Sequence, residues 1–180
     1  MKRELLIGCG NSRNKSIYFE EETKEWTNLT TIDIDPNCGA DVVHDLEITP
    51  WPFDDNTFDE IHAYDVLEHL GKQGDYKSFF QHFAEIYRIL KPDGLLICST
   101  PSIHSRWVWG DPGHTRYVGP ESLVFLSQDQ YTNQIGKSQM TDYRQIWKGD
   151  LETVDCNEDD ADFQFIVKAI KPSRIEPKFL

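Results

Sequence analysis

Residues 5–13 read Leu5-Leu6-Ile7-Gly8-Cys9-Gly10-Asn11-Ser12-Arg13, an apolar run that ends in Gly-x-Gly. A short apolar run without alternation predicts a buried strand of a parallel sheet. The two glycines lack a Cβ, so the chain can turn sharply there and a ligand can approach the main chain closely. The N–H groups of such a turn can face polar ligand atoms. The stretch therefore predicts a first strand followed by a binding turn.

A second run of β-branched residues, 29–35, ends in Asp33, Ile34 and Asp35. Asp33 follows Gly10 by 23 positions, near the separation at which a Rossmann-type unit places an acid on a ribose diol. A dinucleotide needs a third glycine three residues after the second, and that position is Arg13. The spacing therefore favours a nucleoside without phosphates and disfavours a nicotinamide-dependent oxidoreductase.

Residues 4–102 carry these motifs in an order that resembles the class I S-adenosylmethionine (SAM) dependent methyltransferases, with Ser12 where a third glycine is usual. The small methyltransferase-11-type members, similar to ubiquinone-pathway O-methyltransferases, are the branch it resembles most. Val66-Leu67-Glu68-His69 and Leu90-Lys91-Pro92-Asp93-Gly94-Leu95 are similar to later motifs of that family. The resemblance implies that SAM is the cofactor and that it is bound by Gly8, Cys9, Gly10, Asp33, Ile34, Asp45, Leu46 and Asp65.

The order of apolar runs and amphipathic stretches predicts an α/β fold in which strands alternate with helices. We expect one domain over residues 1–180, with a Rossmann-like, doubly wound, mostly parallel seven-stranded sheet and an antiparallel final strand. The first strand begins close to Met1, so the fold is expected to be reduced at its N-terminus. The expected strands are 5–7, 29–35, 41–45, 58–64, 95–99, 142–155 and 162–171, and the expected helices are 14–26, 76–90 with Asp75 as N-cap, and 120–135.

The composition narrows the class of partner. With 31 acidic residues against 18 Lys and Arg, the formal charge of −13 repels nucleic acid and gives no support for binding to a membrane surface. The four cysteines show no metal-ligand or disulfide spacing, so we expect reduced thiols and a cytoplasmic location. No secretory segment and no stretch of transmembrane length is found. The oligomeric state stays open.

Residues 103–135 are the least generic part of the chain and are expected to form a substrate lid. The lid combines cationic and aromatic side chains, which would suit a small acceptor that bears a carboxylate or phosphate near a planar body. In the alternative interpretation, the tryptophans pack over the sheet and the charges are solvated. The expected acceptor contacts are Arg106, Trp107, Trp109 and Arg116, and the candidate bases are His104 and His114.

Asp65, Glu68 and His69 stand at i, i+3 and i+4, so a helix after the fourth strand would present them on one face. Ubiquinone-pathway enzymes and small-RNA 2′-O-methyltransferases hold a divalent ion with a similar run. The resemblance therefore implies a site for Mg, Mn or Zn formed by Glu68, His69 and His114. Many relatives instead use Leu-Glu-His, without a metal, to cap the helix and line the donor pocket.

These patterns predict an enzyme that transfers a methyl group from SAM to a small, anionic acceptor. A degenerate SAM-binding module, which acts as a sensor or a partner protein, is the alternative function.

Overall fold

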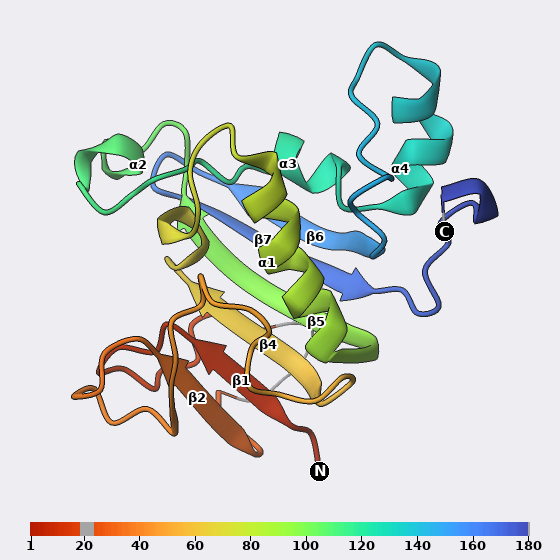
Figure 1. Cartoon of the computed structure of the whole chain (residues 1–180). Helices are drawn as coiled ribbons and strands as arrows, with labels where there is room; N and C mark the ends of the chain where they lie inside the picture. Colours follow the sequence, from red (N-terminus) through yellow and green to blue (C-terminus); the bar gives the residue numbers. More distant parts are fainter. Residues whose placement is uncertain (19–23, 180) are drawn as a thin grey trace.

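The computed structural model describes residues 1–18 and 24–179. Among these residues, seven strands form one sheet in the order β3-β2-β1-β4-β5-β7-β6 (Figure 1). The first five strands are parallel, and β7 is antiparallel to both of its neighbours. The predicted mostly parallel α/β sheet is therefore confirmed. The strands are β1 (Glu4–Ile7), β2 (Leu29–Asp33), β3 (Val42–Val43), β4 (Phe58–Tyr64), β5 (Leu90–Pro101), β6 (Leu151–Glu158) and β7 (Asp162–Ala169).

The strand order reverses beside β1, which lies between β2 and β4. The connections that follow β1 and β4 therefore leave the sheet in opposite directions. In open α/β sheets, ligands bind outside the carboxyl ends of the strands at such a switch point. The topology alone places a binding site next to the turn that follows β1.

The helix α1 (Tyr76–Ile89) packs across one face of the sheet (Figure 1). Phe80, Phe83 and Ile86 recur at three-residue steps and are buried, which explains why this stretch is helical. The Asp75 side chain accepts a hydrogen bond from the Ser78 backbone N–H at 3.1 Å. The predicted helix and its N-cap are confirmed. The following strand is longer than predicted because pairing with β4 already begins at Leu90.

The opposite face of β1 and β4 is covered by an irregular segment. The helix predicted over 14–26 is wrong for the described residues 14–18 and 24–26, and residues 19–23 lie outside the described part. Lys15 enters the sheet face and pairs with the buried Glu4 carboxylate at 2.7 Å. The Trp26 ring packs edge-on against His62 at 4.8 Å between centroids. These anchors hold the segment in place without a helix.

The chain before β6 differs from the prediction. The strand expected over 142–155 begins only at Leu151 and extends to Glu158, so the turn before β7 lies at 159–161. Trp147 is fully buried, and its Nε1 donates to the Leu126 carbonyl at 2.9 Å. Residues 142–150 therefore bury Trp147 by packing against neighbouring elements rather than by pairing in the sheet, while Ile146 stays exposed.

The predicted lid contains short helices: α2 (Trp107–Gly110), α3 (Pro120–Val124) and α4 (Gln128–Asn133). The single helix expected over 120–135 is broken at Leu126, whose carbonyl accepts the Leu151 N–H at 2.9 Å instead of continuing the helix. Three 3₁₀ turns complete the described elements: η1 (Leu67–His69), η2 (Ile135–Lys137) and η3 (Pro177–Phe179). Within the described ranges, no helix combines the length and apolar composition needed to cross a membrane.

Candidate functional site

The turn after β1 requires glycine at two positions. Gly8 has φ +60° and Gly10 has φ +48°, both in the left-handed region that glycine favours. A Cβ on Gly8 would lie 2.4 Å from Cγ2 of Val66, whereas a Cβ on Gly10 would meet no atom within 4 Å. Gly8 is therefore needed for close packing against the chain after β4. Gly10 borders open space that a ligand can occupy.

Asp33 ends β2 beside this turn. Its Oδ2 accepts the Gly10 N–H at 2.8 Å, and its Oδ1 accepts the Asp35 N–H at 2.8 Å. An ionised carboxylate can accept about four hydrogen bonds. Asp33 therefore keeps capacity for two ligand hydroxyls, as the predicted contact with a ribose requires.

The end of β3 and the loops after β2 and β3 expose apolar side chains at the same edge of the sheet. Ile34, Val43 and Ile48 are 64%, 53% and 60% exposed. The predicted contacts Asp45 and Leu46 lie in the turn that follows β3, and Leu46 is buried. Exposed aliphatic side chains next to a polar turn are suited to a purine ring, which needs both apolar faces and hydrogen-bonding edges.

A second cluster, formed by Glu68, His69 and His114, lies at the carboxyl end of β4. One ligand atom from each residue lies within 4.8 Å of the others. The two imidazole rings meet edge to face, with 4.6 Å between centroids. His69 Nδ1 lies 3.1 Å from the Gly113 carbonyl, so Nδ1 carries the proton and Nε2 is left as an acceptor. The structure thus brings together the three predicted metal ligands.

Several atoms of this cluster are buried without a hydrogen-bond partner among the described residues: both carboxylate oxygens of Glu68 and Nδ1 of His114. Burial, together with the charges of Asp65, Asp111 and Asp162, raises the pKa of Glu68 to about 8. Unsatisfied buried polar atoms are costly, and a surplus of acidic groups attracts cations. The environment is therefore one that a bound cation would stabilise.

Asp65 lies outside this cluster. The segment after β4 forms the single 3₁₀ turn η1 rather than the expected helix, and Asp65 precedes it with φ +54°. Its Oδ1 lies 3.4 Å from the Ser99 hydroxyl, between the ends of β4 and β5. The expected i, i+3, i+4 face is therefore wrong. Glu68 and His69 meet His114 because the lid folds back over η1, where Thr115 and Arg116 donate to the Glu68 carbonyl.

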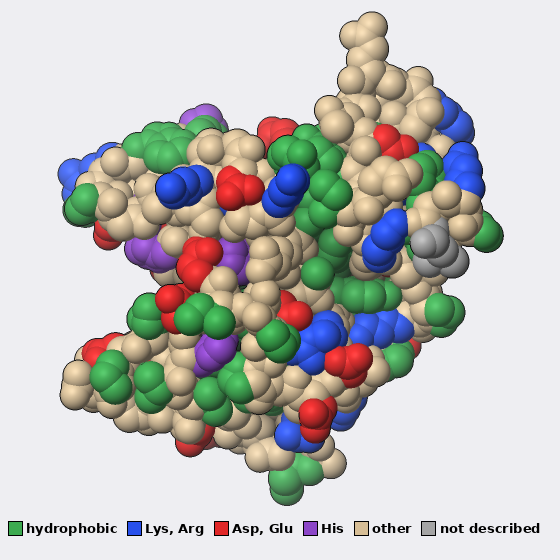
Figure 2. Space-filling view, viewed as in Figure 1, with side chains coloured by type: hydrophobic (Ala, Val, Ile, Leu, Met, Phe, Trp, Pro, Cys, Tyr) green, Lys and Arg blue, Asp and Glu red, His purple; other side chains and the backbone are tan. Residues whose placement is uncertain are grey.

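The other predicted lid residues are separated by the structure. His104, Arg106, Trp107 and Trp109 are exposed on and before α2, where the Arg106 guanidinium lies 5.1 Å from the centroid of the Trp107 ring. Figure 2 shows a hollow in the surface on the left of the view, with histidine and acidic side chains on its walls. The segment around α2 forms one wall of this hollow, as comparison with Figure 1 shows.

Arg116 points elsewhere. It is 5% exposed, and its Nη2 donates to the carbonyls of Lys72 and Asp75 at 3.0 and 3.2 Å. It lines a cavity of about 300 Å³ together with Phe79 and Tyr143. Arg116 and His114, two residues apart, therefore face different spaces.

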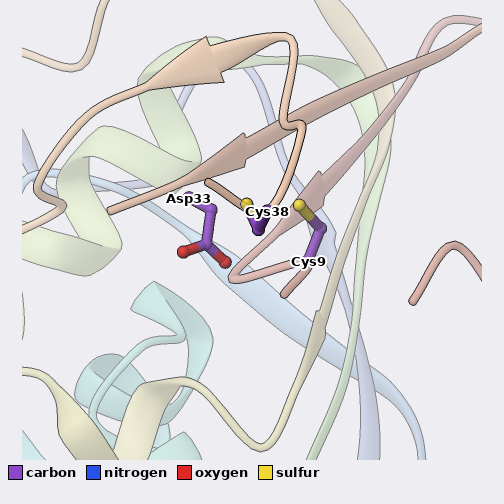
Figure 3. A group of neighbouring side chains, drawn as sticks. All are labelled: Cys9, Asp33 and Cys38. Atoms are coloured by element: carbon purple, nitrogen blue, oxygen red, sulfur yellow. The ribbon is translucent and has the colours of Figure 1, made fainter. Parts of the chain in front are cut away.

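The sequence did not predict that Cys9 and Cys38 lie together. Their sulfur atoms and the Asp33 carboxylate are within 4.8 Å of one another (Figure 3). The sequence contains the information needed to predict this contact. Cys9 follows β1 and Cys38 follows β2, and these two strands are adjacent and parallel, so their carboxyl ends meet.

Comparisons with known proteins agree with this geometry. The family model described as "Methyltransferase domain" matches residues 5–98. A search of curated proteins found no match. A SAM-dependent methyltransferase from Archaeoglobus fulgidus is 15% identical with a TM-score of 0.55, over 93% of this chain and 86% of that chain.

Two further solved structures share the fold. The complex between the Trm112 methyltransferase activator and a methyltransferase of Haloferax volcanii gives a TM-score of 0.56 at 16% identity, covering 94% of this chain and 83% of that chain. The N-methyltransferase NodS from Bradyrhizobium japonicum WM9, in complex with S-adenosyl-L-homocysteine, gives a TM-score of 0.51 at 14% identity. The match covers 93% of this chain and 78% of that chain. The family match spans more than half of the 180 residues. The chain therefore belongs to the methyltransferase domain family of class I SAM-dependent methyltransferases.

Proposed function

We propose that this protein transfers the methyl group of SAM to a small acceptor whose nucleophilic atom lies at the Glu68–His69–His114 cluster. The observation that carries the proposal is the position of this cluster. Gly8 packs against Val66, and Glu68 follows Val66 by two residues, so the cluster adjoins the turn that would hold the donor. Donor and acceptor would meet at one edge of the sheet.

The donor half of the reaction rests on the residues after β1, β2 and β3. The Gly8–Gly10 turn would receive SAM against its backbone, and Asp33 would accept from the ribose hydroxyls. Ile34 would cover one face of the adenine, with Asp45 and the Leu46 N–H at its edge. SAM already carries its leaving group, so the residues mainly have to align the acceptor with the S–CH3 bond at about 3 Å and exclude water.

The acceptor half of the reaction needs a group that can take up a proton when the acceptor is a hydroxyl. Of the two predicted bases we favour His114, because its Nδ1 has no hydrogen-bond partner in the described part of the chain and its Nε2 lies 3.9 Å from Glu68 Oε1. His104 is exposed on the lid. We assign it to the wall of the hollow rather than to proton transfer.

A divalent ion fits the cluster. The donor set contains one carboxylate and two imidazoles, and a cation would satisfy the Glu68 carboxylate, whose buried oxygens have no hydrogen-bond partner among the described residues. Glu68, His69 and His114 would hold Mg, Mn or Zn, for which such mixed ligands are suitable. When bound, the ion would lower the pKa of an acceptor hydroxyl, and His114, as one of its ligands, would then act by holding the ion and not as the base.

The acceptor is proposed to be small and anionic. Arg106 lies over Trp107 at the wall of the hollow, so a cation and an exposed aromatic face are available together. This pair is suited to a carboxylate or phosphate that is attached to a planar or apolar body. Within the predicted lid, 103–135, Arg106, Trp107 and Trp109 would close over such an acceptor.

A SAM-binding partner protein is the alternative. The methyltransferase of Haloferax volcanii is in a complex with an activator, so a protein partner is a reasonable proposal for this chain as well. A SAM-binding module without catalytic activity would not require a cation beside the methyl donor, so cation binding at the Glu68–His69–His114 cluster would favour the enzyme.

Calorimetric titration with Mn²⁺ and, separately, with SAM tests the proposed cluster without knowledge of the acceptor. The parent is expected to bind one Mn²⁺ per chain, and Glu68→Gln is expected to lose this binding while it still binds SAM. Glu121→Gln, on the exposed surface of α3, makes the same chemical change away from the cluster and should behave as the parent. Equal Mn²⁺ affinity for Glu68→Gln and the parent would contradict the proposal.

A further inference from the structure

Cys9, Asp33 and Cys38 form a compact group at the ends of β1 and β2 (Figure 3). All three are at least nine-tenths buried, with 5%, 9% and 9% exposure respectively. Each offers one ligand atom, and these atoms lie within 4.8 Å of one another. Asp33 ends β2, and the two cysteines lie in the loops that follow the adjacent strands β1 and β2, so the sheet fixes their proximity.

We propose that Cys9, Cys38 and Asp33 form a second metal site, specific for a thiophilic divalent ion such as Zn²⁺ or Cd²⁺, whose occupation excludes SAM. Two thiolates and one carboxylate are a suitable donor set for these ions, and a water molecule can complete four-coordination. Mg²⁺ prefers oxygen ligands and does not suit the sulfur atoms. The site therefore differs in chemistry from the Glu68–His69–His114 cluster.

The charges around the group are compatible with a bound ion. When the ion binds, two sulfur–metal bonds form and the two thiol protons are released to solvent. The two thiolates and the Asp33 carboxylate then carry three negative charges, against the two positive charges of the ion. The Arg13 guanidinium supplies a further positive charge. It donates to the Gly10 carbonyl at 2.9 Å and to the Cys38 carbonyl at 3.2 Å, which holds the two loops together.

Competition with SAM follows from the shared residue. The Asp33 carboxylate already accepts the N–H groups of Gly10 and Asp35. Its remaining capacity can serve either the ribose hydroxyls or a metal ion, but not both at full strength. Cys9 is also part of the turn against which SAM would lie. An ion bound here therefore blocks the cofactor directly.

Cd²⁺ is a suitable probe because its bonds to thiolates produce a charge-transfer absorption in the ultraviolet that nitrogen and oxygen ligands do not give. The titration uses a Cys156→Ser background, since Cys156 is exposed and would react separately. We expect the absorption to saturate at one Cd²⁺ per chain. The apparent Kd for SAM, measured by calorimetry, should rise in proportion to the Cd²⁺ concentration and return to its original value after chelation.

Cys38→Ser in the same background is the decisive variant, and Cys98→Ser, in the buried part of β5, is its matched control. Cys38→Ser should lose the Cd²⁺ absorption and the competition between Cd²⁺ and SAM, and it should bind SAM normally in the absence of metal. The Cys98→Ser control should keep both the absorption and the competition. Cys38→Ala replaces it if circular dichroism shows that Cys38→Ser is unfolded. The proposal is overturned if Cd²⁺ does not change the affinity for SAM. It is also overturned if Cd²⁺ still competes with SAM in the Cys38 variant, because the inhibitory ion would then lie at the Glu68 cluster. SAM binding without metal remains as an independent test of the cofactor site.

Discussion

The Oδ2 atom of Asp33 accepts a hydrogen bond from the backbone N–H of Gly10 at 2.8 Å, across 23 residues of sequence. This contact joins the loop after β2 to the loop after β1. It also orients the carboxylate before any ligand arrives, because Asp35 holds the other oxygen. Preorganisation of this kind lowers the entropy lost on binding. The same carboxylate therefore shapes the turn and, in the proposed function, would bind the ribose.

Replacement of Asp33 by Ala is expected to weaken SAM binding by roughly 1 to 3 kcal/mol, or about 5- to 150-fold, because the ribose hydroxyls lose a charged acceptor. Asp35→Ala removes the same charge two residues away, at an exposed position, and should change the affinity little. Calorimetric titration with SAM compares the two. Equal affinity for Asp33→Ala and the parent would remove this residue from the cofactor site.

Gly8→Ala and Gly10→Ala separate the packing role of the turn from its binding role. Both positions have positive φ, which costs about 1 kcal/mol for an added side chain. Only the Cβ on Gly8 clashes with Val66. Gly8→Ala should therefore lose clearly more unfolding free energy in urea than Gly10→Ala. Gly10→Ala should fold well but lose SAM affinity, because its Cβ enters the space left for the ligand. The reverse order of stabilities would contradict this assignment.

His114→Ala and His104→Ala test which lid histidine acts in the reaction. Loss of a general base typically lowers the rate by about 10²- to 10⁴-fold. We expect an effect of that size on kcat for His114→Ala, and only a small change for the exposed His104→Ala. Methyl transfer from labelled SAM measures both. If His104→Ala is the more damaged variant, the proton acceptor lies in the turn before α2 and not beside Glu68.

Acid sensitivity should arise from a buried group on the other face of the sheet. Burial alone would raise the pKa of Glu60, but hydrogen bonds from His62 and Lys2 lower it to about 2. The unfolded chain therefore takes up a proton near the usual pKa of 4.5, whereas the folded chain does so only near 2. The stability that Glu60 contributes is complete above the unfolded value and is lost as the pH falls through the folded one.

Urea unfolding between about pH 5 and about pH 2 measures this slope. Glu60→Gln should show a flatter dependence than the parent. Glu152→Gln, on β6, is the control and should keep the slope of the parent. An unchanged slope in Glu60→Gln would show that other carboxylates dominate acid unfolding.

Strands and the long helix could be predicted where the local pattern and the packing agree. β4 has the predicted bounds, Phe58–Tyr64, because it pairs with β1 and β5 and buries Phe58, Ile61 and Ala63 in the core. Residues 142–150 were expected to continue the closing strand, since their apolar residues are compatible with a strand. The sequence could not show that Trp147 packs against Phe80 of α1, at 5.8 Å between ring centroids.

The candidate site was predictable where adjacent strand ends determine it, as for Gly10 and Asp33. The backbone at Asp65 was not, because this residue adopts a positive φ before η1, and a single 3₁₀ turn follows in place of the expected helix. Nothing local in the sequence separates the directions of His114 and Arg116. Their placement depends on how the whole lid folds over η1.

The most direct test of the account is transfer of a labelled methyl group from SAM into a small-molecule extract, measured with the parent, Asp33→Ala and Glu68→Gln, each with Mn²⁺ and with excess chelator. The account predicts that the parent protein labels a small anionic compound in the presence of Mn²⁺. Either substitution, or the chelator, should reduce this labelling strongly. Tight SAM binding with no label in any fraction would contradict the proposed methyl transfer to a small acceptor. Full labelling in excess chelator would contradict the proposed role of the Glu68–His69–His114 cluster.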